Sequence, residues 1–214
     1  MAIVTSGPMV GFVGTVGNIT YYTLPDGRTC ARQKNGPRSV PPTLKQLANE
    51  ADTKLVAKFM KPFKEFISVG YQLEAKKVYQ NPYNMMVKYI RKNAIEGTYP
   101  NRRINITKVL VANGDLPAAS ETSVAATEKG LTFKWSTELV RKLSHHTDQV
   151  MMMAYFPEIQ HTEYVLGGVQ RFVGTDILNL TGVKKGVAGE VFISFIADDH
   201  TSISNSIYLG KFDW

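Results

Sequence analysis

The chain has 214 residues, of which 43% are hydrophobic and 20% are charged, as is ordinary for a folded soluble protein. Its single cysteine, Cys30, excludes an internal disulfide framework and a multi-cysteine metal site. Residues 1–103 carry 16 Lys and Arg against 6 Asp and Glu, whereas residues 104–214 carry 9 against 12, so the net charge of +7 comes from the first half.

Residues 1–10 lack the basic segment and the apolar core of a secretory signal peptide. No stretch approaches the roughly 18 apolar residues that span a bilayer. We therefore expect no membrane span and synthesis in the cytoplasm without a Sec signal peptide. The sequence does not fix the final location, for which a particle and an extracellular filament are the two possibilities considered.

The opening of the chain is β-prone and punctuated by glycines. The glycines are Gly7, Gly11, Gly14 and Gly17, and the apolar residues among and after them are Val10, Phe12, Val13, Val16, Ile19, Tyr21 and Tyr22. Pro25-Asp26-Gly27 is a strong turn signal, so the pattern predicts a β-hairpin whose return strand begins at Arg28. Glycines inside a strand usually mark bulges or the close approach of another backbone. A phosphate-binding loop would need GxxxxGK[ST] or GxGxxG, and neither is present.

Helical periodicity follows a Pro-rich basic loop. Thr43 and Gln46 match a capping box at the start of a helix. The apolar stripe predicted for this helix is Leu44, Leu47, Ala48, Ala51, Leu55, Phe59, Phe63 and Phe66. Pro62 should kink or split it. A second helix is predicted to start with Asn81 as N-cap and Pro82 at its first position.

From residue 104 onward, short β-prone runs alternate with turn residues. The predicted strands are 108–112, 131–135, 150–156, 163–166, 170–173, 176–180, 189–196 and 202–209. Such spacing is typical of a β-sandwich, and without a second cysteine the pattern favours the fibronectin type III variety over an antibody domain. The predicted fold is therefore α+β. A basic β-hairpin and helical module (1–103) with two or three helices precedes an immunoglobulin-like or fibronectin III-like β-sandwich (104–214).

Basic side chains cluster near the hairpin and the second helix. They are Arg28, Arg32, Lys34, Arg38, Lys88, Arg91, Lys92, Arg102 and Arg103. Arginine on irregular backbone is suited to bidentate contacts with phosphate or carboxylate, so these residues are the candidate contacts for a polyanion or an acidic partner. Lysines on an outer helix face are more often simply solvated, and no recognised nucleic-acid motif accompanies them.

No pattern in the chain indicates catalysis. His145-His146 and Asp198-Asp199-His200 fall in predicted loops, and a metal site needs three or four convergent ligands. The G-x-S-x-G elbow of a serine hydrolase is absent. We therefore predict no catalytic residue, no metal, no cofactor and no small-molecule substrate.

Several segments resemble, in order and nearly end to end, a family of short bacterial proteins classed only as a domain of unknown function. They are GFVGTVGNITYY, PRSVPPT, KNAIEGTYPN, KVLVANGDLPAA and SNSIYLG. The resemblance implies no activity, cofactor or catalytic residue. Leu24-Pro25-Asp26 stands where members of the family often have a shorter basic turn.

Three functions are weighed on these grounds. The favoured one is a non-catalytic, self-assembling structural subunit of a phage-like virion or an extracellular filament, in which the glycine-spaced apolar segment pairs with another copy and basic and acidic halves meet head to tail. The alternative is a nucleic-acid-binding protein that uses its basic half. A carbohydrate-binding or hydrolytic protein with its site at the tips of the sandwich is the third.

Overall fold

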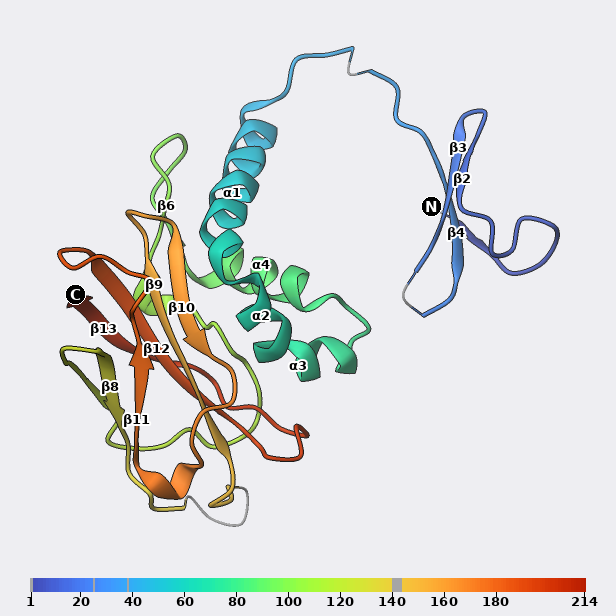
Figure 1. Cartoon of the computed structure of the whole chain (residues 1–214). Helices are drawn as coiled ribbons and strands as arrows, with labels where there is room; N and C mark the ends of the chain where they lie inside the picture. Colours follow the sequence, from blue (N-terminus) through green and yellow to red (C-terminus); the bar gives the residue numbers. More distant parts are fainter. Residues whose placement is uncertain (1, 25, 38, 140–143) are drawn as a thin grey trace. The chain divides into compact units, whose positions relative to one another are not determined.

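The computed structural model describes residues 2–24, 26–37, 39–139 and 144–214 (Figure 1). The chain forms two compact units, Met1–Thr43 and Leu44–Trp214. Between the last strand of the first unit and the first helix of the second, residues 34–37 and 39–43 form neither helix nor strand. The prolines and glycine of this segment account for its irregular backbone.

The first unit is a four-stranded antiparallel sheet in the order β1-β4-β3-β2. Its strands are β1 (Ala2–Val4), β2 (Gly14–Val16), β3 (Ile19–Thr23) and β4 (Thr29–Gln33). The expected hairpin is present as β3 and β4, joined through a turn in which Gly27 has φ +83°. Pro25 of that turn lies outside the described residues. Strands β1 and β2 extend the hairpin to a sheet, and at three residues each they are too short to show an alternating pattern.

The second unit begins with helices. They are α1 (Leu44–Met60), the single 3₁₀ turn η1 (Lys61–Phe63), α2 (Lys64–Gly70), α3 (Gln72–Lys77) and α4 (Pro82–Asn93). Pro62 lies in η1 and splits the first helix as predicted, because proline lacks the backbone N–H that the helix would use. The Asn81 side chain accepts a hydrogen bond of 2.8 Å from the Tyr83 N–H, which confirms the predicted start of α4.

The buried face of α1 differs from the predicted stripe. Val56, Phe59 and Met60 point into the core, together with Asp52, whereas Leu44 is 74% exposed. The prediction was wrong for Leu44, whereas the later residues of the stripe are partly buried (Leu47, Ala48, Ala51, Leu55) or buried (Phe59, Phe63, Phe66). Packing rather than local periodicity therefore selects the inward face.

The remaining strands form two larger sheets and one small pair. The elements are β5 (Ile95–Glu96), β6 (Arg103–Ile104), the 3₁₀ turn η2 (Ile106–Lys108), β7 (Ser123–Ala126), β8 (Gly130–Lys134), β9 (Gln149–Phe156), β10 (His161–Val165), the 3₁₀ turn η4 (Arg171–Val173), β11 (Thr175–Asn179), β12 (Ala188–Ile196) and β13 (Ile207–Asp213). The sheet orders are β10-β9-β12-β13, β11-β8-β7 and β5-β6, and all neighbouring strands in them are antiparallel.

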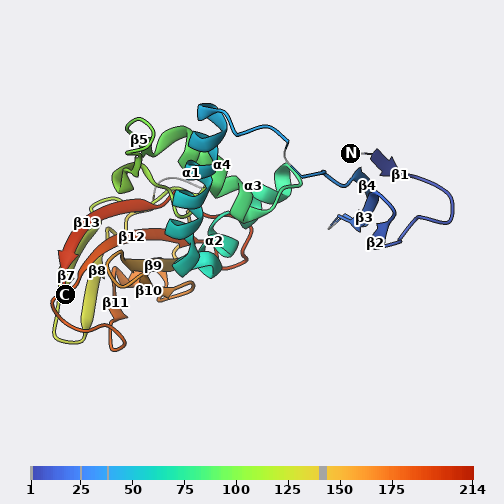
Figure 2. The same ribbon diagram turned by 90° about the horizontal axis from the view of Figure 1, so that it is seen from above.

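The second unit has three layers, with the four-stranded sheet in the middle (Figure 2). Alternate residues of β9 and β12 point to opposite faces. One face shares a core with the three-stranded sheet, formed in part by Phe133, Trp135, Val150, Met152, Leu178, Ile193 and Phe195. The other face packs against the helices through Val56, Phe59, Phe63, Ile90, Met151, Met153, Tyr155 and Phe192. Burial on both faces explains the continuous apolar run of β9.

This arrangement places the division of the chain elsewhere than the predicted boundary at residue 103. The helices of residues 44–93 share their core with β9 and β12, so they belong to the same unit as the sheets. Composition suggested a change at 103, where helical patterns give way to strands. Because side chains on both sides of that point are buried together, the boundary between the compact units falls instead between residues 43 and 44 of the chain.

Two predicted strands are absent, and three strands of the second unit, β5, β6 and β7, were not predicted. Residues 109–112 follow the 3₁₀ turn η2 without entering a sheet, and residues 171–173 form η4, with Gln170 in an isolated bridge to Gln149. Val109, Val111 and Ala112 are apolar because they are buried, not because they pair, whereas Phe172 and Val173 are 55% and 45% exposed. Conversely, β7 pairs with β8 although its sequence, SVAA, has no strong strand signal. The fold is nevertheless mixed α+β, as predicted.

Candidate functional site

The first unit exposes most of its apolar side chains. The exposed fractions are 66% for Val13, 53% for Val10, 48% for Ile3 and 47% for Val16. Of the described residues in this unit, only Thr29 and Cys30 are buried. A sheet this small has too little interior to remove its own apolar surface from water.

A loop before β2 builds part of this apolar surface. The ring of Phe12 packs edge-on against Tyr21 of β3, with ring centroids 5.7 Å apart. The N–H of Gly11 donates a hydrogen bond of 2.7 Å to the Thr29 hydroxyl, which holds the loop over the sheet. Phe12 of the loop remains 39% exposed, and Ile19 of β3 remains 42% exposed. The loop therefore contributes exposed apolar surface of its own and leaves part of the sheet's apolar surface uncovered.

The four glycines singled out from the sequence, Gly7, Gly11, Gly14 and Gly17, all have positive φ. At Gly17 the reason is a turn: with Asn18 it joins β2 to β3, and its φ is +58°. At Gly14 the φ is +148°, and an added Cβ would lie 3.4 Å from the Phe12 ring. These glycines therefore shape the loops that carry Val10, Phe12 and Val13.

The two faces of the small sheet both carry apolar groups. The pairing places Val16, Ile19 and Tyr21 on one face, whereas Ile3, Tyr22 and Cys30 share the other. Its edge strands, β1 and β2, contain no charged residue. Uncharged, apolar edges are the kind that add a further strand.

Only some of the basic residues predicted in the first unit are free of an ion pair and could contact a polyanion. Arg28 forms an ion pair with Asp26 at 2.5 Å, and its hydrogen bonds hold the pKa of the Asp26 carboxyl below its usual range. Arg32 and Lys34 are exposed. Arg38 lies outside the described residues. Of the four predicted contacts here, two therefore present an unpaired charge among the residues the structure describes.

Two shallow hollows lie along α4 in the second unit. The first, of about 510 Å³, is lined by Lys64, Ser68, Asn81, Pro82, Tyr83 and Asn84. The second, of about 540 Å³, is lined by Asn84, Val87, Lys88, Arg91 and Lys92. Asn84 lines both, so we treat them as one groove, called the α4 groove below. The predicted residues Lys88, Arg91 and Lys92 come together here because they lie on one side of α4.

The last two predicted cations do not join the α4 groove. Arg102 forms an ion pair with Asp52 of α1, whose side chain is only 5% exposed. Arg103 lies 3.9 Å from Glu96, a residue that also pairs with Lys108 at 2.9 Å. Arg102 is therefore paired within the fold, whereas the exposed Arg103 shares the Glu96 carboxylate with Lys108.

Groups that would suggest catalysis stay apart. His145 and His146 are exposed, and Asp198-Asp199-His200 lies in an exposed turn in which Thr201 donates to Asp199. Within the described ranges, no three His, Cys, Asp or Glu side chains are close enough to hold a metal ion. Cys30 is buried and makes no disulfide. Across the same ranges, no helix has the length and apolar character needed to cross a membrane.

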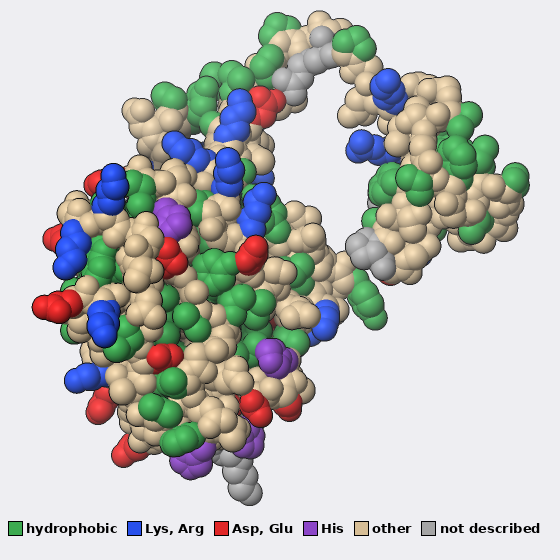
Figure 3. Space-filling view, in the orientation of Figure 1, with side chains coloured by type: hydrophobic (Ala, Val, Ile, Leu, Met, Phe, Trp, Pro, Cys, Tyr) green, Lys and Arg blue, Asp and Glu red, His purple; other side chains and the backbone are tan. Residues whose placement is uncertain are grey.

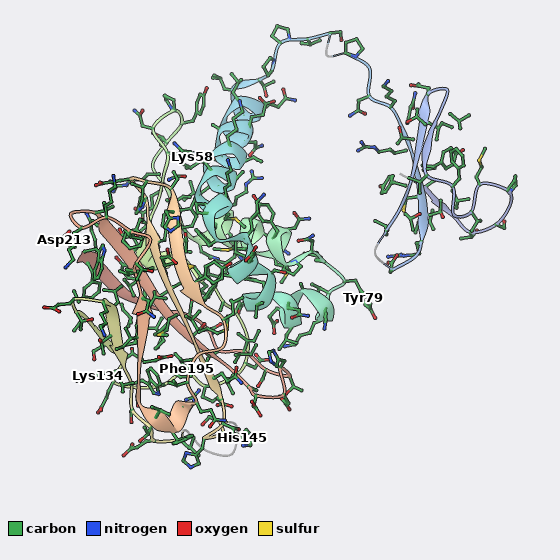
Figure 4. The ribbon with its side chains drawn as sticks, in the orientation of Figure 1. Lys58, Tyr79, Lys134, His145, Phe195 and Asp213 are labelled. Carbon is green, nitrogen blue, oxygen red and sulfur yellow. The ribbon has the colours of Figure 1, made fainter. Side chains whose placement is uncertain are left out.

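One residue of the α4 groove was not singled out from the sequence. Lys64 joins the groove from α2, and its proximity to α4 depends on tertiary packing and has no local signal. Tyr79, in the connection before α4, is 88% exposed (Figure 4). It is one of several tyrosines that the sequence offers as stacking or interface anchors, most of which were expected in the core.

Comparison with protein families identifies the chain at the level of its family. The model of a family of unknown function, DUF6266, matches residues 11–210, so the chain belongs to that family and the resemblance seen in the sequence is confirmed. The matched range begins in the loop before β2 and ends in β13, and thus includes parts of both units. Neither a curated protein nor a solved structure matches the chain.

Proposed function

We propose that this member of the DUF6266 family is a non-catalytic structural subunit that assembles with copies of itself through its first unit. The particle would be a phage-like virion or an extracellular filament. The observation that carries the proposal is the apolar surface of the 2–24 segment, led by Val13, Val10 and Val16, on a sheet with uncharged edges.

A second copy is the favoured occupant of this surface for two reasons. An uncharged edge strand such as β2 pairs readily with an extended segment of a neighbour, and an identical sheet offers such an edge. In addition, residues 1–43 carry four basic residues and one acidic residue, whereas residues 104–214 carry an acidic excess of three. Opposite charges favour a head-to-tail contact between subunits, which produces filaments when the rotation does not close.

The tether between the units supports assembly as well. Ten residues, 34–43, connect β4 to α1, and three of them are proline. Proline-rich segments are extended at about 3.1 Å per residue, so the tether spans roughly 30 Å. That reach is sufficient for the first unit to contact an adjacent subunit.

We also propose that the two sheets of the second unit form a sandwich of the immunoglobulin or fibronectin III type. Support comes from the strand order. Counting from β7, the second strand pairs with the fifth, the third with the sixth, and the sixth with the seventh. The same neighbours occur in immunoglobulin domains, apart from the fourth strand. Here the fourth strand, β10, pairs with β9 instead.

Sedimentation of the full chain at several concentrations tests the assembly proposal. We expect oligomers whose mass grows with concentration, and we expect the double variant Val13→Asp/Val16→Asp to sediment as a monomer, because each added carboxylate would have to be buried in the contact. The matched control is Val78→Asp/Ile177→Asp, which changes two side chains of the second unit that are 50% and 45% exposed.

The control variant should assemble like the unmodified chain. A full-length protein that stays monomeric at high concentration would overturn the proposal. Equal dissociation of both double variants would also count against it, because the effect would then follow from added charge rather than from the first unit.

A further inference from the structure

The α4 groove is a basic surface with no acidic residue in its lining. Its lining residues contribute four cations, Lys64, Lys88, Arg91 and Lys92, and no Asp or Glu. Within the described ranges, none of the four has a carboxylate at ion-pair distance. Arg91 donates a hydrogen bond of 2.9 Å to the Asn49 side chain, which orients the guanidinium and leaves its charge uncompensated.

Nearby acids are already engaged. Asp52 pairs with Arg102, Glu74 with Lys77, and Glu65 accepts a hydrogen bond from Tyr164. Further basic side chains lie along α1, including Lys58 (Figures 3 and 4). Residues 44–93 carry ten Lys and Arg against four Asp and Glu, so the helical layer presents a positive field, and such a field attracts a polyanion.

An exposed aromatic residue, Tyr79, lies in the segment that leads into α4. Tyr79 precedes the groove residue Asn81 by two positions, and its φ of +52° is a conformation that a bulky residue rarely adopts. The backbone there closes α3: the N–H of Tyr79 bonds to the Lys76 carbonyl at 3.3 Å, and that of Gln80 to the Ala75 carbonyl at 2.9 Å. This closure fixes the backbone of Tyr79 while the ring faces solvent.

The composition of the groove favours nucleic acid over a protein partner. Protein interfaces have an apolar core and are depleted in lysine. By contrast, the groove has three lysines and one arginine, with Val87 as its only aliphatic side chain apart from Pro82. A charged groove that follows the backbone, beside an aromatic ring on which a base stacks, is the arrangement that binds single strands without reading sequence.

We infer that the α4 groove binds single-stranded nucleic acid, with phosphates on Lys64, Lys88, Arg91 and Lys92 and an unpaired base stacked on Tyr79. This binding is independent of the assembly surface, because the residues of the two sites lie in different units. Four phosphate contacts imply a salt dependence that is steep enough to measure.

Fluorescence anisotropy with the full-length protein tests the inference. The probes are labelled oligothymidylate, labelled oligouridylate and a DNA duplex of equal length. With four phosphate contacts on a single strand, the affinity should fall about 50-fold between 50 and 200 mM salt. Tighter binding of either single strand than of the duplex supports the inference, and the two single-strand probes distinguish DNA from RNA as the source. A duplex bound equally well, or no binding at 50 mM salt, would overturn it.

Charge-reversal variants test whether binding depends on the α4 groove or only on the net charge of the protein. Lys88→Glu/Lys92→Glu should nearly abolish binding, whereas the matched control Lys129→Glu/Lys184→Glu, on exposed positions of the sandwich, should leave it close to that of the unmodified protein. In the milder variant Lys88→Gln/Lys92→Gln, two contacts remain and the loss over the same salt range should shrink to about 7-fold. Equal weakening by both charge-reversal pairs would mean that only net charge matters, and the groove assignment would be wrong.

Substitution of Tyr79 tests the stacking contact. We expect Tyr79→Gly to weaken binding of a single strand at least 5-fold and Tyr79→Phe to retain it, since stacking on an aromatic ring is worth a factor of this order or more. Glycine suits the positive φ of this position, so a loss of binding by Tyr79→Gly without a fall in melting temperature cannot be ascribed to misfolding. Unchanged binding by Tyr79→Gly would overturn the single-strand assignment.

Discussion

Arg171 and Asp148 form an ion pair in the interior of the second unit, with Arg171 Nε 3.2 Å from Asp148 Oδ2 and both side chains essentially inaccessible to solvent. The guanidinium lies 4.3 Å from the centre of the Phe195 ring and donates to the Pro117 carbonyl at 2.8 Å. Burial lowers the pKa of Arg171, and the Asp148 carboxylate opposes that effect. Within the described residues, Asp148 Oδ1 and Arg171 Nη1 have no hydrogen-bond partner, so the charges depend on each other.

Removing one member of this pair should destabilise the protein strongly. We expect Asp148→Ala to lower the free energy of unfolding by about 3 to 5 kcal/mol, because Arg171 would remain buried without a counter-charge. Urea denaturation measures the change, and Asp213→Ala, at an exposed position, should alter it by less than about 0.5 kcal/mol. The double variant Asp148→Leu/Arg171→Met should be more stable than Asp148→Ala. If it is less stable, burial of an unpaired charge is not the cause.

The shared core between helices and sheet predicts how fragments behave. A fragment of residues 44–214 should unfold cooperatively, since it contains both core clusters. A fragment of residues 104–214 should not, because it would expose one face of the middle sheet, including Met151, Met153 and Phe192. Binding of a hydrophobic dye and the cooperativity of urea unfolding distinguish the two. A well-folded 104–214 fragment would restore the boundary expected from the sequence.

Two tyrosines make stability dependent on alkaline pH. A hydrogen bond to Glu65 and burial raise the pKa of Tyr164 from 10.0 to about 12, and burial together with the Glu190 hydrogen bond raises the pKa of Tyr208 to about 12. Because the folded state favours the protonated phenols, their contribution to stability is complete below pH 10 and is lost as the pH rises towards 12. Both side chains are partly exposed, so solvent screening should keep the loss small.

Ultraviolet titration of tyrosinate measures these two groups directly. We expect Tyr164→Phe and Tyr208→Phe each to remove one late-ionising phenol from the folded protein. Burial also raises the pKa of Tyr71 and of Tyr155, and both of these phenols remain in the two variants. The free energy of unfolding of the double Phe variant should fall less steeply between about pH 10 and 12 than that of the unmodified chain. Ionisation of both tyrosines near pH 10 in the folded protein would contradict the assignment.

The conformation of Tyr79 predicts a stabilising substitution. With φ at +52°, the Cβ of Tyr79 crowds its own backbone, and glycine removes that contact. We expect Tyr79→Gly to raise the free energy of unfolding by roughly 0.5 to 1 kcal/mol, measured by urea denaturation. Tyr79→Ala keeps the Cβ and should give no such gain. If alanine and glycine stabilise equally, removal of the exposed ring rather than relief of strain would be responsible.

Much of the second unit's local structure was predictable from the sequence, because short-range chemistry governs it. Asn81 and Pro82 start α4, Pro62 divides α1 from α2, and the apolar run of 150–156 forms a strand. The missed elements are those in which local preference is weak. β7 is held by its pairing with β8, and residues 171–173 form a 3₁₀ turn in which Arg171 is buried while Phe172 and Val173 are exposed.

For the candidate sites, the sequence identified basic residues but could not show which residues lie next to them in space. It pointed to Lys88, Arg91 and Lys92, and these do line one groove. It also grouped Arg102 and Arg103 with them, but in the structure Arg102 forms an ion pair with Asp52 and Arg103 lies near Glu96. Arg102 and Asp52 are 50 positions apart, and Arg103 reaches Glu96 only across the β5–β6 pairing, so local patterns could not separate paired from unpaired cations.

The sequence by itself determined the family, the mixed α+β class, the β3–β4 hairpin and the beginnings of the helices, since each depends on residue types at short spacing. Only the tertiary structure decided that the helices share a core with β9 and β12 and that the boundary between the units falls between residues 43 and 44. It also decided which cations remain unpaired. The physical reason is that burial and ion pairing are set by contacts between segments far apart in the chain, whereas caps, turns and proline breaks act within a few residues.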